Sequence, residues 1–331
     1  MPRKVTLADV AAAAGVSKMT ASRAMRGAKD VSQKNLDKVR KAAQDIGYVG
    51  NHVAASLSNN RSDLIGVVVP SLSNIVFSEV MSGIERAIDG SGFQPVFGVT
   101  DYDTEKEYDI VRRMLSWRPA GLIVTGLDQS DATLRLLQED SLPVVQIMDT
   151  DGTPIDVSVG FSQDNAAEEM AKALVAAGRR RIGYVGCNLD HDTRAARRRI
   201  RFSQTLETLG HPLAGEEIAE GMSSVAAGRW LTSALLERHP DMDCIYYSND
   251  DMAAGGLFHC MAYNIKVPEK LMLAGFNGLD LLTSLPAPIA TTRTPRDQIG
   301  RRAAEAILER LNRTERDGPT VIELAPEIRL P

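Results

Sequence analysis

Residues 6–25 read TLADVAAAAGVSKMTASRAM, and this stretch decides the fold of the first part of the chain. Thr6 stands three residues before Asp9, the spacing of a capping box at the start of a helix. Apolar residues then recur at helical spacing until Gly15, which favours a helix end. Ser17 is placed to cap a second short helix. Two short helices joined by a glycine-containing turn predict a helix-turn-helix.

The second of these helices has polar side chains in its first turns. When such a helix enters the major groove, its first residues face base edges, while hydroxyl and arginine side chains reach phosphates. Lys18 can donate to guanine, and Met19 can pack on a thymine methyl. The alternative is a solvated helix face with an incidental basic residue. The residues of this segment predicted to contact DNA are Thr6, Ser17, Lys18, Met19, Thr20, Ser22 and Arg23.

Charge is distributed unevenly over the 331 residues. Residues 1–61 contain eleven Lys and Arg and four Asp, a net charge of +7. Because the whole chain carries −5, subtracting +7 leaves −12 for the remainder. A basic module joined to an acidic body indicates a polyanion partner for the module alone.

From Leu64 onward, apolar runs typical of buried parallel strands alternate with amphipathic helical stretches. This alternation predicts an α/β architecture with doubly wound parallel sheets. Ligands of such sheets bind beyond the carboxyl ends of the strands, so two lobes would hold a ligand in the cleft between them. The predicted strands are LIGVVVP (64–70), PVFGV (95–99), GLIVT (121–125), PVVQIM (143–148), RIGYVG (181–186), CIYYS (244–248) and LMLAGF (271–276).

The segment quoted above resembles the signature of the lactose-repressor (LacI/GalR) family of bacterial regulators, V-T-x-x-D-V-A-x-x-A-G-V-S-x-x-T-x-S-R. In that family the two positions after the serine differ between members and choose the operator half-site; here they are Lys18 and Met19. The positions that match in register are Val5, Thr6, Asp9, Val10, Ala11, Ala14, Gly15, Val16, Ser17, Thr20, Ser22 and Arg23.

The resemblance covers nearly the whole chain. It implies an all-α helix-turn-helix headpiece, a hinge, and an α/β effector domain of two periplasmic-binding-protein-like lobes joined by three crossovers. The implied bounds are 1–49 for the headpiece, 50–61 for the hinge and 62–331 for the effector-binding and dimerisation domain, with an N-lobe at about 62–162 and 293–318 and a C-lobe at about 163–292 and 319–331.

In this family the hinge becomes a short helix when two copies pair in the DNA minor groove, where a leucine wedges between base pairs and kinks the duplex. Leu57 occupies the matching position, although an ordinary linker leucine is the alternative. The family usually has proline where this chain has Gly50, so ordering the hinge should cost more conformational entropy. The hinge residues expected to contact DNA are Asn51, His52, Ala54 and Leu57.

Candidate cleft residues follow strand ends or begin helices. Arg198 is the side chain we expect to hold an effector carboxylate, because a guanidinium matches two carboxylate oxygens. The alternative is that the arginine run around it is a solvated helix face, and Phe77 and Phe161 could equally be core residues. Asp149 ends an apolar strand, where a lone carboxylate needs a partner. The full set is Ser73, Asn74, Phe77, Asp149, Phe161, Arg198, Asn249, Asp250, Asn277 and Arg293.

Several motifs, among them SNDDMAAG and TRTPRDQIG, look like the gluconate-operon repressors within the family. This similarity implies a sugar acid as effector. Those repressors tend to carry histidine where this chain has Asn277, which puts the polyol end of the ligand in doubt.

Other classes of protein find little support. The chain lacks GxSxG, P-loop, GxGxxG and HExxH motifs, so we do not expect an enzyme or a cofactor. His191 between two aspartates has no further ligand in a plausible metal constellation, so a polar loop is expected there. Cys187, Cys244 and Cys260 lack CxxC pairing and are expected to be buried thiols. No apolar run is long enough to span a membrane, and no secretory signal begins the sequence.

We therefore expect a cytoplasmic homodimer, because palindromic double-stranded operator DNA needs two headpieces. An effector in the cleft would separate the two hinges and release the operator. The alternative is a regulator of the co-repressor type, recruited to DNA by a neutral sugar or another small metabolite.

Overall fold

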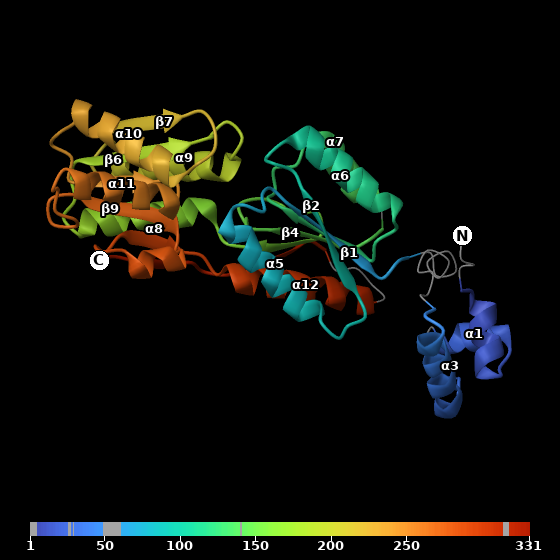
Figure 1. Ribbon diagram of the computed structural model, residues 1–331. Helices are drawn as coiled ribbons and strands as arrows, with labels where there is room; N and C mark the ends of the chain where they lie inside the picture. The colour runs from blue at the N-terminus through green and yellow to red at the C-terminus, as the bar shows by residue number, and fades with distance from the viewer. Residues whose placement is uncertain (1–4, 26–27, 29, 49–60, 140, 314–317) are drawn as a thin grey trace. The chain divides into compact units, whose positions relative to one another are not determined.

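The computed structural model describes residues 5–25, 28, 30–48, 61–139, 141–313 and 318–331. The chain divides into two compact units, Met1–Ser62 and Asp63–Pro331 (Figure 1). None of the helices in the described ranges combines the length and apolar character that a membrane crossing requires. The predicted hinge contacts Asn51, His52, Ala54 and Leu57 lie outside the described residues.

In the first unit, the described residues form three helices: α1 (Leu7–Ala14), α2 (Lys18–Met25) and α3 (Gln33–Asp45). The capping box predicted at the start of α1 is present, with the Thr6 and Asp9 side chains each bonded to the other's backbone N–H. Gly15 ends α1 in the left-handed conformation, at φ 65°. The small core of the unit includes Val10, Ala21 and Val39, one from each helix.

The N-lobe of the second unit contains a fully parallel six-stranded sheet in the order β11-β5-β4-β3-β1-β2. Helices α5 and α12 pack together on one face, while α6 and α7 cover the other. The elements are β1 (Leu64–Val69), α5 (Ile75–Ile88), β2 (Gln94–Val99), α6 (Thr104–Ser116), β3 (Gly121–Thr125), α7 (Asp131–Glu139), β4 (Val144–Ile147), β5 (Val157–Gly160), α12 (Arg296–Asn312) and β11 (Thr320–Glu323).

The C-lobe repeats this plan with the order β12-β10-β9-β8-β6-β7, parallel except for the antiparallel edge strand β12. Helices α8 and α9 pack on one face and α10 and α11 on the other. The elements are α8 (Gln163–Ala176), β6 (Ile182–Cys187), α9 (Thr193–Thr208), β7 (Gly215–Ala219), α10 (Val225–Arg238), β8 (Cys244–Tyr247), α11 (Asp250–Ala262), β9 (Met272–Asn277), η1 (Asp280–Ser284), β10 (Ala290–Arg293) and β12 (Glu327–Arg329).

The chain passes between the lobes after β5, after β10 and between β11 and β12. The predicted lobe bounds were wrong at two points. Residues 319–331 were assigned to the C-lobe, but Thr320–Glu323 extend the N-lobe sheet beside β5, so the last crossing falls between β11 and β12. Arg293 was assigned to the N-lobe, but it pairs with Asn277 in the C-lobe sheet.

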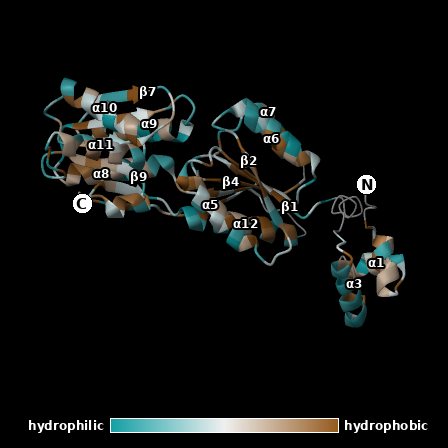
Figure 2. Ribbon diagram, in the orientation of Figure 1, coloured by the Kyte–Doolittle hydropathy of each residue, from teal (hydrophilic) through white to brown (hydrophobic). Residues whose placement is uncertain are grey.

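Burial explains how these layers hold together. Strand interiors are apolar while outward helix faces are hydrophilic (Figure 2), which is the division that drives collapse of an α/β lobe. Helices α5 and α12 approach so closely that a Cβ on Gly300 would lie 2.0 Å from the Val80 carbonyl oxygen. All three cysteines are free and buried, as predicted.

Candidate functional site

The first candidate surface is the exposed side of α2. Lys18 is exposed, and the Met19 side chain is 72% exposed although it is large and apolar. Arg23 is also exposed and forms an ion pair with Asp30. The opposite side of α2 is anchored by buried Ala21 and Ala24. Within this unit, α2 therefore presents a cation and an apolar side chain outward on a fixed backbone.

Two of the residues predicted to contact DNA, Ser17 and Thr6, form hydrogen bonds within the first unit. The Ser17 hydroxyl accepts the backbone N–H of Thr20 at 3.0 Å and so caps α2. The Thr6 hydroxyl donates to the Asp9 carboxylate at 2.7 Å. A hydroxyl keeps spare hydrogen-bonding capacity beyond one such bond. These contacts leave Thr6 and Ser17 able to meet a phosphate while they hold the two helix starts.

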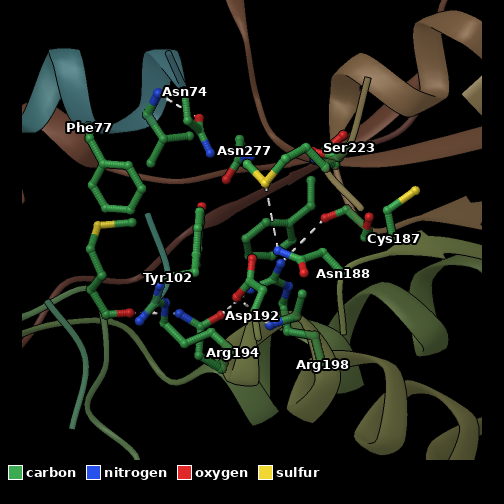
Figure 3. Close-up of a pocket in the computed structure, with 18 of the residues that line it drawn as sticks. Asn74, Phe77, Tyr102, Cys187, Asn188, Asp192, Arg194, Arg198, Ser223 and Asn277 are labelled. Atoms are coloured by element: carbon green, nitrogen blue, oxygen red, sulfur yellow. Dashed lines mark hydrogen bonds between the residues drawn. The ribbon is translucent and has the colours of Figure 1, made fainter. Parts of the chain in front are cut away.

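The second candidate site is a pocket between the lobes of the effector domain, with about 640 Å³ of space including solvent at its mouth. Arg194 and Arg198 extend from α9 on one side, and Phe77 of α5 and its N-cap residue Asn74 lie on the other (Figure 3). The lining residues are Asn74, Val76, Phe77, Tyr102, Met148, Phe161, Gln163, Cys187, Asn188, Asp192, Arg194, Ala195, Arg198, Met222, Ser223, Ser248, Asn249, Phe276 and Asn277.

Arg198 is 8% exposed and is held on three sides. Its Nη1 donates to Gln163 Oε1 at 2.6 Å and its Nη2 to the Ser248 carbonyl at 3.3 Å. The guanidinium carbon lies 3.9 Å from the centre of the Phe276 ring, a cation–π contact. The guanidinium has five N–H donors, so some remain for a ligand.

Asp149 does not line the pocket, but it links the lobes next to it. This carboxylate follows β4 of the N-lobe, is 1% exposed, and pairs with Arg197 of α9 at 2.8 Å. Arg197 also pairs with Asp151 at 2.9 Å. Burial raises the pKa of Asp149, and the Arg197 charge opposes that rise. The partner expected for a carboxylate at this strand end is thus an arginine of the other lobe.

Asn74, Phe77, Phe161, Arg198, Asn249 and Asn277 line the pocket, whereas Ser73, Asp149, Asp250 and Arg293 do not. The Ser73 hydroxyl shares a hydrogen bond with Ser71. The Asp250 carboxylate is buried, accepting the Leu279 N–H and the Thr291 hydroxyl at 2.7 Å each, so it supports the C-lobe sheet. Arg293 is exposed beside a different cavity.

Sequence reasoning missed Tyr102 and Arg194. Tyr102 follows β2 in the left-handed conformation (φ 62°), a position that the strand-end rule would have found. Its pKa is raised by burial and then by the Asp192 charge. Arg194 lies in the first turn of α9 beside the helix cap Asp192, four residues before Arg198. Among the described residues, no group of three or more His, Cys, Asp or Glu side chains is placed to hold a metal ion.

Comparison with known families identifies both units. Residues 6–51 match the model for bacterial regulatory proteins of the lacI family, and residues 62–327 match the model for periplasmic binding proteins and the sugar binding domain of the LacI family. The chain belongs to the LacI family. Members of this family are DNA-binding transcription regulators, so this LacI-family chain is a transcriptional repressor and not an enzyme.

Similar proteins share the fold over almost their full length. A crystallised LacI-family transcriptional regulator from Silicibacter pomeroyi is 46% identical, with a TM-score of 0.92 and 98% of each chain covered. The HTH-type transcriptional regulator GntR of Pseudomonas aeruginosa is 38% identical over 92% of this chain and 88% of its own length. The lac repressor dimer bound to operator, 24% identical over 98% of each chain with a TM-score of 0.85, shares the fold. The predicted fold class is confirmed.

Proposed function

We propose that this LacI-family repressor responds to a small sugar acid, gluconate-like, bound between its two lobes. The observation that carries the proposal is the charge of the pocket lining, where Arg194 and Arg198 face a single carboxylate, Asp192. Net positive charge in a largely buried pocket favours an anion. Amide side chains suited to several hydroxyl groups complete the lining: Asn74, Asn188, Asn249 and Asn277.

Arg198 is proposed to hold the carboxylate of the acid. Gln163, Ser248 and Phe276 fix its guanidinium before any ligand arrives. A fixed donor loses little conformational entropy on binding. Asn249 is also held in advance, because its Nδ2 donates to Ser223 at 2.8 Å. The resemblance of the sequence to gluconate-operon repressors supports the same class of ligand.

On the DNA side, α2 is proposed to lie in the major groove of an operator half-site. The exposed Lys18 and Met19 would read bases, while Thr6, Ser17, Thr20, Ser22 and Arg23 would contact the backbone. The proposal extends to the hinge residues Asn51, His52, Ala54 and Leu57 on the basis of the family resemblance alone.

We propose that two copies bind one palindromic operator, one headpiece to each half-site. The protein would act in the cytoplasm, because the operator DNA lies there. The C-lobe offers an apolar surface for pairing: Phe258 and Met261 of α11 are 41% and 52% exposed, and Tyr263 just beyond the helix is 67% exposed. Helix α5, at about residues 79–87, is the proposed second contact. Effector binding would shift the lobes, separate the hinges and weaken DNA binding through a coupling of about 1–3 kcal/mol.

Selection from a pool of random duplexes, using the full chain, tests this function. The enriched duplexes should share a palindrome, and D-gluconate should elute them while D-glucose does not. Enrichment only in the presence of a neutral sugar would instead support a regulator recruited to DNA by its ligand. If no duplex is enriched, or if elution ignores every sugar acid in a panel, the proposal is wrong.

A further inference from the structure

The arginines of α9 differ in whether their N–H donors have hydrogen-bonded acceptors. Arg197 pairs with Asp149, Arg199 with Glu216 and Arg201 with Glu168. Arg198 has Gln163, the Ser248 carbonyl and the Phe276 ring. Arg194 is the exception among the arginines of this fully described helix.

Arg194 has two nearby carboxylates, Asp192 and Asp128, but no hydrogen-bonded acceptor among the described residues. Its closest carboxylate oxygen, Asp128 Oδ1, lies 3.8 Å from Nη1, whereas a charge-assisted hydrogen bond is about 2.7–2.9 Å long. The side chain is only 11% exposed, so water has limited access to it. A buried guanidinium with unfilled donors is unfavourable until an acceptor arrives.

A ligand in the pocket between the lobes could supply the missing acceptor. Arg194 lines the pocket between the lobes, beside Tyr102 and opposite the α5 side chains (Figure 3). It also lines a smaller neighbouring cavity, together with Asp128 and Glu107. The guanidinium therefore lies between the pocket and a carboxylate of the opposite lobe.

We propose that Arg194 makes this pocket select an anionic ligand over its neutral counterpart, and that Asp128 competes with the ligand for it. The inference rests on the proposed function and deepens it. Arg198 already donates to Gln163 and to the Ser248 carbonyl, which orient it, so its remaining N–H groups can serve a hydroxyl as well as a carboxylate. The unfilled N–H donors of Arg194 gain most from a carboxylate.

The competition connects ligand binding to the arrangement of the lobes. Asp128 follows β3 in the N-lobe and also accepts a hydrogen bond from the Thr193 hydroxyl of α9. Arg194 drawn toward a bound carboxylate moves away from Asp128 and leaves that carboxylate with Thr193 alone. One interaction between the lobes is then exchanged for one with the ligand, which gives the ligand a differential effect on two lobe arrangements.

Calorimetric titration of the full-length chain with D-gluconate and with D-glucitol tests this inference, since the two probes differ at the carboxylate. Arg194→Gln should weaken gluconate binding about 10- to 100-fold, the worth of a hydrogen bond to a charged group, and leave glucitol binding unchanged. Asp128→Asn should tighten gluconate binding. Arg201→Gln, on the same helix but paired with half-buried Glu168 and absent from the pocket lining, is the matched control and should bind like wild type.

Four other outcomes of these titrations would contradict the inference or the proposed function. Gluconate affinity that survives Arg194→Gln but falls with Arg198→Gln overturns the role of Arg194 and leaves the proposed sugar-acid effector intact. Equal losses for gluconate and glucitol in Arg194→Gln show a general effect on the pocket and also overturn it. No tightening in Asp128→Asn contradicts the competition. A wild-type chain that binds no sugar acid overturns both the inference and the proposed function.

Discussion

The helices α2 and α9 each contribute cationic side chains to one of the two candidate sites, and they hold their side chains in opposite ways. On α2, Lys18 and Met19 point into solvent and are fixed only by the local backbone. On α9, Arg197 and Arg198 are tied to residues 35 to 50 positions away in the sequence. A surface that meets a wet polyanion needs no internal partners, whereas most charged side chains beside a buried pocket are held by partners of the same fold.

The largest expected effect breaks the pair between the lobes. Arg197→Met leaves the Asp149 carboxylate, 1% exposed, without its cation, so the effector domain should lose about 3 kcal/mol of unfolding free energy. Arg201→Met removes a partly exposed pair on the same helix and should cost about 1 kcal/mol. Chemical denaturation followed by circular dichroism measures both. Equal losses would mean that burial does not distinguish the two pairs.

On α2, removing a cationic side chain should leave the unfolding free energy unchanged and alter the recognition of DNA. Lys18→Ala should reduce discrimination between the operator and duplexes with altered half-sites by about 2 kcal/mol, roughly 30-fold. The unfolding midpoint should stay unchanged because Lys18 is exposed. Fluorescence anisotropy with a series of duplexes measures the discrimination. A uniform loss for all duplexes would assign Lys18 to phosphate contact instead.

Glu107 of α6, which lines a small cavity with Arg194, should make the stability of the protein depend on pH. Burial and then the Asp128 charge raise its pKa to about 7, with Arg194 opposing the rise. The folded state thus prefers the protonated acid, and its contribution to stability is complete below pH 4.5 and is lost as pH rises through 7. Glu107→Gln should therefore be more stable than wild type by about 1.5 kcal/mol at pH 8, after discounting for partial exposure, and equal to it near pH 4.5. If the difference in unfolding free energy between Glu107→Gln and wild type does not vary with pH, the raised pKa of Glu107 is not its cause.

The smallest effect concerns the start of α1. Thr6→Ala removes the hydrogen bond from the Asp9 N–H to the Thr6 hydroxyl in the capping box. The unfolding free energy of the headpiece should fall by about 1 kcal/mol. Thermal unfolding of the full chain, followed by amide signals of the first unit, measures this loss. Thr6→Ser keeps the hydroxyl and should behave like wild type. A loss shared by both variants would assign the effect to the methyl group and not to the cap.

The headpiece could be predicted from sequence because its determinants are local. The capping box joins residues three apart, and Gly15 ends the helix by its own conformation. The long apolar strands were also predictable. The edge strands β7 (GEEIA), β11 (TVIE) and β12 (EIR) were missed, because they are half exposed and lack the apolar run of a buried strand. The inner strands β5 (VSVG) and β10 (ATTR) were also missed, because they are largely buried but only four residues long and include polar residues.

The pocket was predictable only in part. Positions after strand ends and near helix starts gave six lining residues, and Arg198 was among them. Asp250 was misjudged because the sequence could not reveal that the Thr291 hydroxyl and the Leu279 N–H satisfy its carboxylate. For the same reason, Arg194 could not be separated from the other arginines of its run. The separation requires the positions of Asp149, Glu216 and Glu168, which are distant in sequence.

The measurement that bears most directly on this account is the affinity of the full chain for D-gluconate with and without saturating operator duplex. If the pocket and α2 are coupled, operator must weaken gluconate binding by the same factor by which gluconate weakens operator binding, about 5- to 150-fold. Identical gluconate affinities in the two titrations would contradict the account, because a ligand that binds both states equally cannot shift a repressor off its DNA.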